Sequence, residues 1–134
     1  MTSILRSIAA VLVGLILISV VVEALEAALV LAVHGGLTTD PVVYFGIRNR
    51  PWFLALKLVY NTAAAVLGGF LTARIAGRLG LAHGLLLAIV QTVAFVYALA
   101  TPDMRQWTPI WMWLALIVVT AAGIVVGARM ARRG

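Results

Sequence analysis

The sequence has no cysteine, and only two of its 134 residues are histidines. Without cysteine the chain has no disulfide, no thiolate nucleophile and no cysteine-ligated metal. His34 and His83 fall at the ends of different apolar segments, so we expect no metal site from them. No nucleophile–base pair is visible, which argues against an enzyme, including one that acts on lipid. We therefore predict no catalytic residues, no cofactor and no metal.

Charged residues are scarce as well. Four acids and ten bases make up 10% of the chain, against about 25% in soluble domains. The bases are spread over the termini and connections, so they form no recognition surface and we expect no nucleic-acid partner. Arginines beside apolar segments are typical of membrane proteins, where they set the orientation and meet anionic lipid headgroups.

Apolar residues, by contrast, are abundant: they make up 64% of the chain, against about 45–50% in soluble proteins. A membrane span needs roughly 20 mostly apolar residues to cover about 30 Å of hydrocarbon. Four segments are long enough, at about residues 5–33, 51–74, 80–101 and 108–129, and the connection 35–50 joins the first two. We predict an all-α fold with one transmembrane domain over residues 1–134, an integral membrane four-helix bundle.

The distribution of basic residues predicts the orientation of this bundle. With both termini in the cytoplasm, six arginines lie inside and four basic residues lie in the outer half, as the positive-inside rule requires. The connection 35–50 is then outside. All four tryptophans fall at the outer ends of the second and fourth spans, where rings at the headgroup level are common; because such a belt usually occupies both interfaces, some of these rings could instead pack against a partner or roof an outer cavity.

Two acidic residues interrupt the first span. Glu23 and Glu26 are three residues apart, so they share one face of a helix. Glu23 lies 17 residues after the inner anchor Arg6, and Lys57 lies 17 residues before the inner anchor Arg74, about 25 Å in each case. Their equal depth predicts a Glu23–Lys57 pair, with Glu26 one turn nearer the surface. We expect Lys57 to neutralise one of the two carboxylates.

Two amides lie below this charge pair. Asn61 and Gln91 are each 13 residues from their inner anchors, Arg74 and Arg78, and therefore both about 20 Å deep. The candidate ligand- or ion-binding residues are Glu23, Glu26, Lys57, Asn61 and Gln91. They have two interpretations. They could form an outward-opening pocket for a proton, a cation or a small ligand, or a charge-paired core that sets the helix register.

Small residues predict where helices pack closely. Gly68 and Gly69 lie on adjacent faces of the second span, and Gly123 and Gly127 are four residues apart on the fourth. In lipid, such small-residue faces allow helices to approach and associate. Two faces on one helix could serve one contact within the chain and one with another protein.

The segment 60–76, followed by His83 and Gly84, resembles a broad class of small uncharacterised four-span bacterial membrane proteins. In that class a glycine-glycine-aromatic-x-x-alanine-arginine segment ends the second span, as residues 68–74 do here. A histidine at the start of span three and an aromatic-rich start of span four are matched by His83 and residues 107–113. The resemblance implies a multi-pass protein of the bacterial cytoplasmic (inner) membrane and no particular activity. The Glu23/Glu26 pair departs from the class.

Two functions follow from these observations. Short connections cannot hold a soluble substrate, and four spans leave little room for a solvated pathway. We therefore expect a small non-enzymatic membrane protein that acts by assembly, as a homo-oligomer or as an accessory subunit of a membrane complex. Its partners would be the lipid bilayer and either itself or another membrane protein. The alternative is a small proton- or cation-coupled transporter or channel that uses Glu23 and Glu26.

Overall fold

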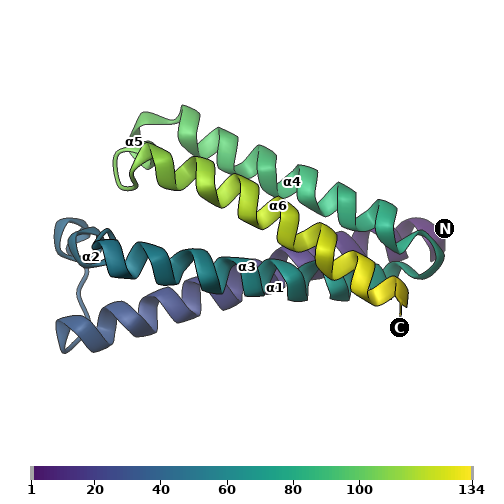
Figure 1. Cartoon of the computed structure of the whole chain (residues 1–134), viewed down its shortest axis with the longest axis horizontal. Helices are drawn as coiled ribbons and strands as arrows, with labels where there is room; N and C mark the ends of the chain where they lie inside the picture. Colours follow the sequence, from purple (N-terminus) through teal and green to yellow (C-terminus); the bar gives the residue numbers. More distant parts are fainter. Residues whose placement is uncertain (1, 134) are drawn as a thin grey trace.

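The computed structural model describes residues 2–133, and the predicted all-α class is confirmed (Figure 1). The long helices are α1 (Thr2–His34), α3 (Pro51–Ala76), α4 (Gly80–Ala100) and α6 (Ile110–Arg133). The short elements are α2 (Pro41–Arg48), α5 (Pro102–Arg105) and the 3₁₀ turn η1 (Gly77–Leu79). Helix α1 begins and α6 ends at the η1 end, opposite α2 and α5 (Figure 1).

Three segments are long and apolar enough to cross a membrane, by length and composition: Ser3–His34, Pro51–Ala100 and Ile110–Arg132. The middle segment comprises α3, η1 and α4, and in Figure 1 its two helices run in opposite directions. Large apolar side chains cover the outer faces of the long helices; Val59 and Val118, for example, are 64% and 66% exposed. So much exposed apolar surface is unusual in a soluble monomer and suits contact with lipid.

Turn chemistry determines where the helices begin and end. Asp40 is the N-cap of α2, where its side chain accepts a 3.0 Å hydrogen bond from the backbone N–H of Val42, and Pro41 occupies the first helical position. At the other end of the molecule, Gly77 has φ +74° and its N–H donates to the carbonyl of Ala73. Glycine adopts this conformation without steric cost, so α3 stops there and the chain reverses into α4.

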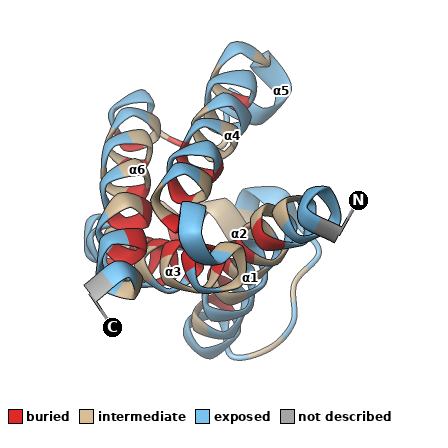
Figure 2. Cartoon of the chain, turned by 90° about the vertical axis from the view of Figure 1, so that its right-hand side faces the viewer, coloured by how far each residue is buried: buried red, intermediate tan, exposed pale blue. Residues whose placement is uncertain are grey.

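Helix α3 lies in the middle of the structure and packs against α1, α4 and α6 (Figure 2). Its contact with α6 is the closest, because glycines bring the two backbones together. A Cβ atom on Gly69 would lie 2.1 Å from the carbonyl oxygen of Ile124, and one on Gly127 would lie 2.0 Å from that of Val66. On Gly123 it would lie 2.9 Å from the Cβ of Ala65.

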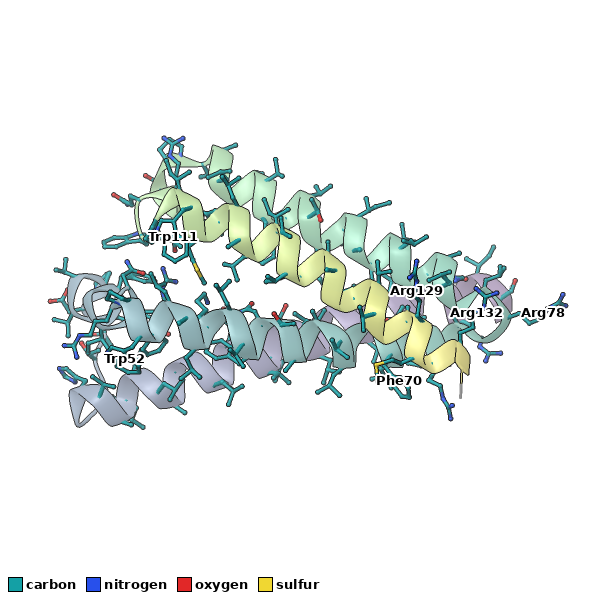
Figure 3. The ribbon with its side chains drawn as sticks, in the orientation of Figure 1. Trp52, Phe70, Arg78, Trp111, Arg129 and Arg132 are labelled. Atoms are coloured by element: carbon teal, nitrogen blue, oxygen red, sulfur yellow. The ribbon has the colours of Figure 1, made fainter. Side chains whose placement is uncertain are left out.

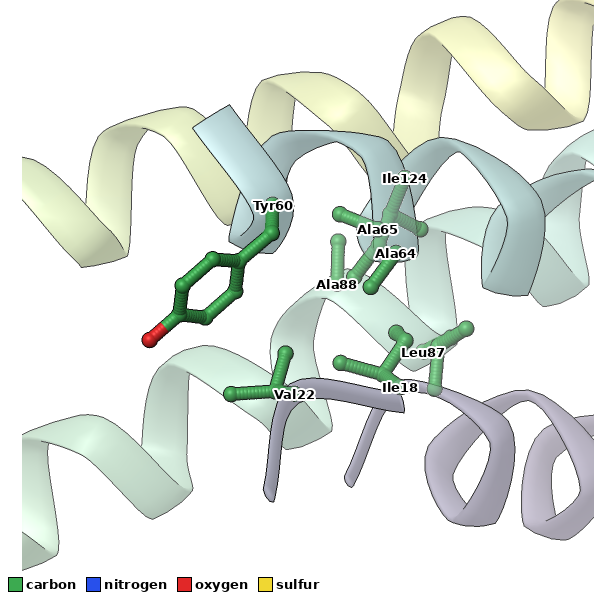
Figure 4. Close-up of a cluster of buried hydrophobic side chains, with 8 residues drawn as sticks. All are labelled: Ile18, Val22, Tyr60, Ala64, Ala65, Leu87, Ala88 and Ile124. Carbon is green, nitrogen blue, oxygen red and sulfur yellow. The ribbon is translucent and has the colours of Figure 1, made fainter. Parts of the chain in front are cut away.

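The second small-residue face of α3 packs against α1. A Cβ atom on Gly68 would lie 2.5 Å from the side chain of Ile18, and one on Gly14 would lie 3.1 Å from the carbonyl of Gly68. Ile18 belongs to a core cluster with Ala64, Leu87 and neighbouring apolar residues (Figure 4). Both faces of α3 are therefore used inside the chain, and neither is left for an intermolecular contact.

The two ends of the molecule differ in chemistry. Trp52 and Trp111 lie at the α2/α5 end, and both are about half exposed, at 49% and 56% (Figure 3). Arg78, Arg129 and Arg132 lie at the η1 end (Figure 3). These two tryptophans and these three arginines therefore lie at opposite ends of the molecule (Figure 3).

The glycine contact between α3 and α6 makes a prediction about stability. Gly69→Ala should lower the free energy of unfolding by about 1–3 kcal/mol, because the added methyl group meets backbone that cannot move aside cheaply. Thermal unfolding in detergent measures this. The control is Gly46→Ala in α2, where a Cβ atom meets nothing within 4 Å. This variant should have an unchanged or slightly higher free energy of unfolding. Equal losses in the two variants would contradict the packing argument.

Candidate functional site

A polar cavity of about 180 Å³ lies near the α2/α5 end, where the α1/α3 and α4/α6 pairs diverge (Figure 1). All five residues predicted as a ligand site line it, and they come from three helices: Glu23 and Glu26 from α1, Lys57 and Asn61 from α3, and Gln91 from α4. The other polar lining residues are Ser19, Arg48, Thr108 and Trp113. At roughly 30 Å³ per water, the cavity has room for about six water molecules.

Glu26 is a buried and fully paired carboxylate of the cavity wall. Only 3% of it is exposed. Its Oε1 accepts a 2.6 Å hydrogen bond from Lys57 Nζ and a 3.4 Å one from the hydroxyl of Tyr60. Its Oε2 accepts a 3.0 Å hydrogen bond from the hydroxyl of Tyr44. A buried carboxylate is tolerated only when it is paired and hydrogen-bonded, and Glu26 meets both conditions.

Arg48 adds a second cation beside Glu26. Its Nη1 lies 3.9 Å from Glu26 Oε1. Its Nη2 donates to the Trp107 carbonyl at 2.6 Å and to the Thr108 hydroxyl, and the guanidinium lies 4.4 Å from the ring centroid of Phe45. These bonds connect α2 to the connection before α6. Because Arg48 is only 7% exposed, burial lowers the pKa of its guanidinium, while Glu26 counteracts that effect.

Tyr44 completes the link between α1 and α2. Burial raises the pKa of its hydroxyl above the ordinary value, and the negative charge of Glu26 raises it further. The hydroxyl therefore stays protonated and donates to the carboxylate. The sequence offered no signal for Tyr44 or Arg48 as part of the site, because both lie in the connection 35–50, where a charge or a phenol ordinarily faces water.

The predicted Glu23–Lys57 pair does not form; Lys57 pairs with Glu26 instead. Glu23 is exposed and lines the cavity, and among residues 2–133 its carboxylate makes no ion pair and no hydrogen bond. Counting residues from the inner anchors treats the helices as parallel, whereas α1 crosses α3 (Figure 1). Residues three apart differ by about 60° around a helix, so a modest rotation decides which carboxylate faces α3.

The two predicted amides reach the same cavity without bonding to each other. Asn61 Nδ2 donates to the carbonyl of Lys57 at 2.8 Å, within α3. Gln91 Oε1 is buried and has no hydrogen-bond partner among the described residues. Trp113 Nε1 is buried and unpartnered in the same way, although the sequence pattern indicates a ring at the headgroup level. An unpaired buried polar atom is costly, so these two atoms mark where a ligand or water would bond.

The floor of the cavity is apolar. Ile18 lines it and packs with Leu87 and Ala64 in the core cluster (Figure 4). Ile18 is 2% exposed, and Leu87 and Ala64 are fully buried. The cavity therefore borders the buried core cluster at Ile18.

Comparison with protein-family models, with curated proteins and with solved structures found no match. The resemblance of residues 68–74 to a class of four-span bacterial proteins therefore stays a prediction. Within residues 2–133, no group of three or more potential metal-ligating side chains lies together. The chemistry of the cavity rests on its charges and its unpaired polar atoms.

The Glu26–Lys57 contact makes a prediction about stability. Lys57→Met should lower the free energy of unfolding by about 3 kcal/mol, because it leaves the buried carboxylate under-compensated. Combining it with Glu26→Gln should restore part of that loss. Unfolding in detergent, followed by tryptophan fluorescence, measures the cycle.

The matched control for this cycle is Glu23→Gln. Since Glu23 is exposed and unpaired, its substitution should change stability by less than about 0.5 kcal/mol and should add independently to Lys57→Met. The opposite result would be a non-additive loss of stability for Lys57→Met with Glu23→Gln and an additive loss for Lys57→Met with Glu26→Gln. It would show that Lys57 pairs with Glu23.

Proposed function

We propose that the chain is a non-enzymatic, multi-pass protein of the bacterial cytoplasmic membrane. In this proposal α1, α3, α4 and α6 each cross the bilayer as a four-helix bundle. Both termini are cytoplasmic, and the connection 35–50 is outside. The return of the chain at Gly77, the exposed apolar faces and the arginines at the η1 end support this arrangement.

Within this arrangement we assign the cavity to a small cation that enters from the outer side, and the protein to transport of that cation. The carboxylate of Glu23 carries the proposal, because it lines the cavity with no ion pair among the described residues. Glu26 is already neutralised by Lys57 at 2.6 Å. Arg48 also lies against Glu26, at 3.9 Å, so Glu23 is the carboxylate of the cavity that no cation contacts, and an ionisable residue at membrane depth is by default a functional one.

Other groups in the cavity suit a cation of limited size. Gln91 Oε1 is an unpartnered acceptor, and Ser19 adds a hydroxyl one turn from Glu23. The rings of Phe95 and Trp113 are arranged edge to face with centroids 6.2 Å apart, and an aromatic face attracts an ammonium group. The apolar floor at Ile18 and Leu87 corresponds to a state open only to the outside, so passage requires that contact to separate.

Assembly is the second candidate. Ser19 and Glu23 lie on an exposed side of α1, and a second protein could cover them and supply a partner for the carboxylate. The glycine faces of α3 do not add to this case, because they are used within the chain. A homo-oligomer or an accessory subunit would therefore associate through α1.

The proposed topology can be tested directly, because the chain has no cysteine of its own. A single cysteine in place of Thr38 should react with a membrane-impermeant thiol reagent added outside intact cells. A cysteine in place of Leu79, which is 64% exposed in η1, should react only after the membrane is opened. The reverse pattern would invert the bundle and move the cavity to the cytoplasmic side.

The transport proposal predicts a flux that depends on Glu23. Purified protein in liposomes with an imposed gradient of K⁺ or methylammonium should carry the cation inward, and Glu23→Gln should lower the rate at least about tenfold, since an intramembrane cation loses its counter-charge. The control is Asp103→Asn, which removes an acid outside the cavity and should leave the rate unchanged.

Two results would overturn the transport proposal. A flux that Glu23→Gln leaves intact would show that the carboxylate does not bind the cation. The absence of any flux, together with co-purification of a membrane partner in fixed stoichiometry, would favour assembly. In that case Glu23→Gln should release the partner.

A further inference from the structure

Two cavities meet at Ser7, between α1 and α4 at the η1 end and far from the outer cavity. The first has a volume of about 360 Å³ and includes charged and polar side chains in its wall; its lining residues are Ser3, Arg6, Ser7, Ala76, Arg78, Leu79 and His83. The second has a volume of about 260 Å³ and is almost wholly apolar; its lining residues are Ser7, Ile8, Val11, Leu12 and Leu86. Because Ser7 lines both, we treat them as adjacent parts of one candidate site, with a charged end and an apolar end.

The charged end holds two arginines without an anion. Arg6 is anchored because its Nε donates to the carbonyl of Ile75, and its Nη2 would lie 3.0 Å from a Cβ atom on Gly77. Within residues 2–133 neither Arg6 nor Arg78 forms an ion pair. The four acidic residues of the chain, Glu23, Glu26, Asp40 and Asp103, belong to the other end or to its connections.

A histidine and two serines complete the polar end. His83 Nδ1 lies 2.7 Å from the carbonyl of Leu79, which can only accept, so Nδ1 carries the proton. In the neutral ring, Nε2 then accepts the 2.7 Å hydrogen bond from the Ser7 hydroxyl. This bond connects α1 to α4 and fixes Ser7 at the point where the two cavities join.

The apolar end follows α1 toward the middle of the membrane. Val11 is four residues from Ser7 and three from Ile8, and Leu12 is four from Ile8, so these residues lie on one side of α1, and Leu86 of α4 forms the facing wall. Ile8 and Leu12 are 52% and 48% exposed. A groove this apolar that opens beside two unpaired arginines fits an amphiphile with an anionic head.

We propose that this composite site binds an anionic phospholipid, with its phosphate diester between Arg6 and Arg78 and one acyl chain along Ile8, Val11 and Leu12. A zwitterionic lipid fits less well, because the site has no carboxylate to receive its ammonium group. Free phosphate fits less well too, since it would leave the apolar groove empty. The inference rests on the proposed membrane insertion but not on the cation cavity.

The experiment measures lipid binding by the purified full chain in a neutral detergent, using native mass spectrometry with phosphatidylglycerol and phosphatidylcholine. One phosphatidylglycerol should stay bound at concentrations where phosphatidylcholine does not. Arg6→Gln and Arg78→Gln should each weaken binding about fivefold. Arg129→Gln, at the same end but outside the cavity, should leave binding unchanged.

A substitution in the apolar groove distinguishes binding of a lipid from binding of an anion alone. Leu12→Trp fills the apolar groove at a half-exposed position, so it should fold and should weaken phosphatidylglycerol binding while both arginines remain. Displacement of the lipid by inorganic phosphate at equal concentration would overturn the proposal in favour of an anion site. Equal losses in Arg6→Gln and Arg129→Gln would overturn it in favour of diffuse attraction. If Arg6→Gln fails to unfold cooperatively, Arg78→Gln and Leu12→Trp test the proposal without it. Unchanged phosphatidylglycerol binding in both of these variants would refute the lipid site.

Discussion

The α2/α5 end of this molecule depends on the carboxylate of Glu26. A charge held at 3% exposure among apolar helices is stable only if cations and hydrogen-bond donors surround it. Lys57 of α3, Tyr44 of α2 and Tyr60 of α3 supply those partners. Three helices are thereby held in one relative position, and α2 is drawn across the end of the bundle where it would otherwise be a free connection.

The same constraint explains why the two ends of the bundle are built differently. Toward the η1 end, Gly69 and Gly127 bring α3 and α6 into backbone contact, and van der Waals packing is sufficient in an apolar setting. Toward the α2/α5 end the helix pairs diverge (Figure 1), and polar bonds such as those of Arg48 span the wider gap. The divergence leaves the cavity beside Glu23.

The two ends of the molecule also differ in their unpaired charges, and the two proposed sites reflect that difference. The cavity at the α2/α5 end has an unpaired carboxylate at Glu23 and an apolar wall at Ile18, which suits a cation. The site at the η1 end has unpaired arginines at Arg6 and Arg78 and an apolar groove beside Ser7, which suits an anionic lipid. In the cavity the cations Lys57 and Arg48 lie against Glu26 and not Glu23, whereas the acidic residues of the chain lie away from Arg6 and Arg78.

The sequence by itself determined the helical class, the approximate bounds of the long helices, and the residues that line the outer cavity, because hydropathy and residue depth depend on counting along one helix. It could not decide that Lys57 pairs with Glu26, that both glycine faces of α3 are internal, or that Arg48 and Trp113 belong to the cavity wall. Those outcomes depend on how each helix is rotated about its own axis and on the angle at which it crosses its neighbours. Only the packing of the whole bundle sets these, since a turn of about 60° exchanges one carboxylate for the other.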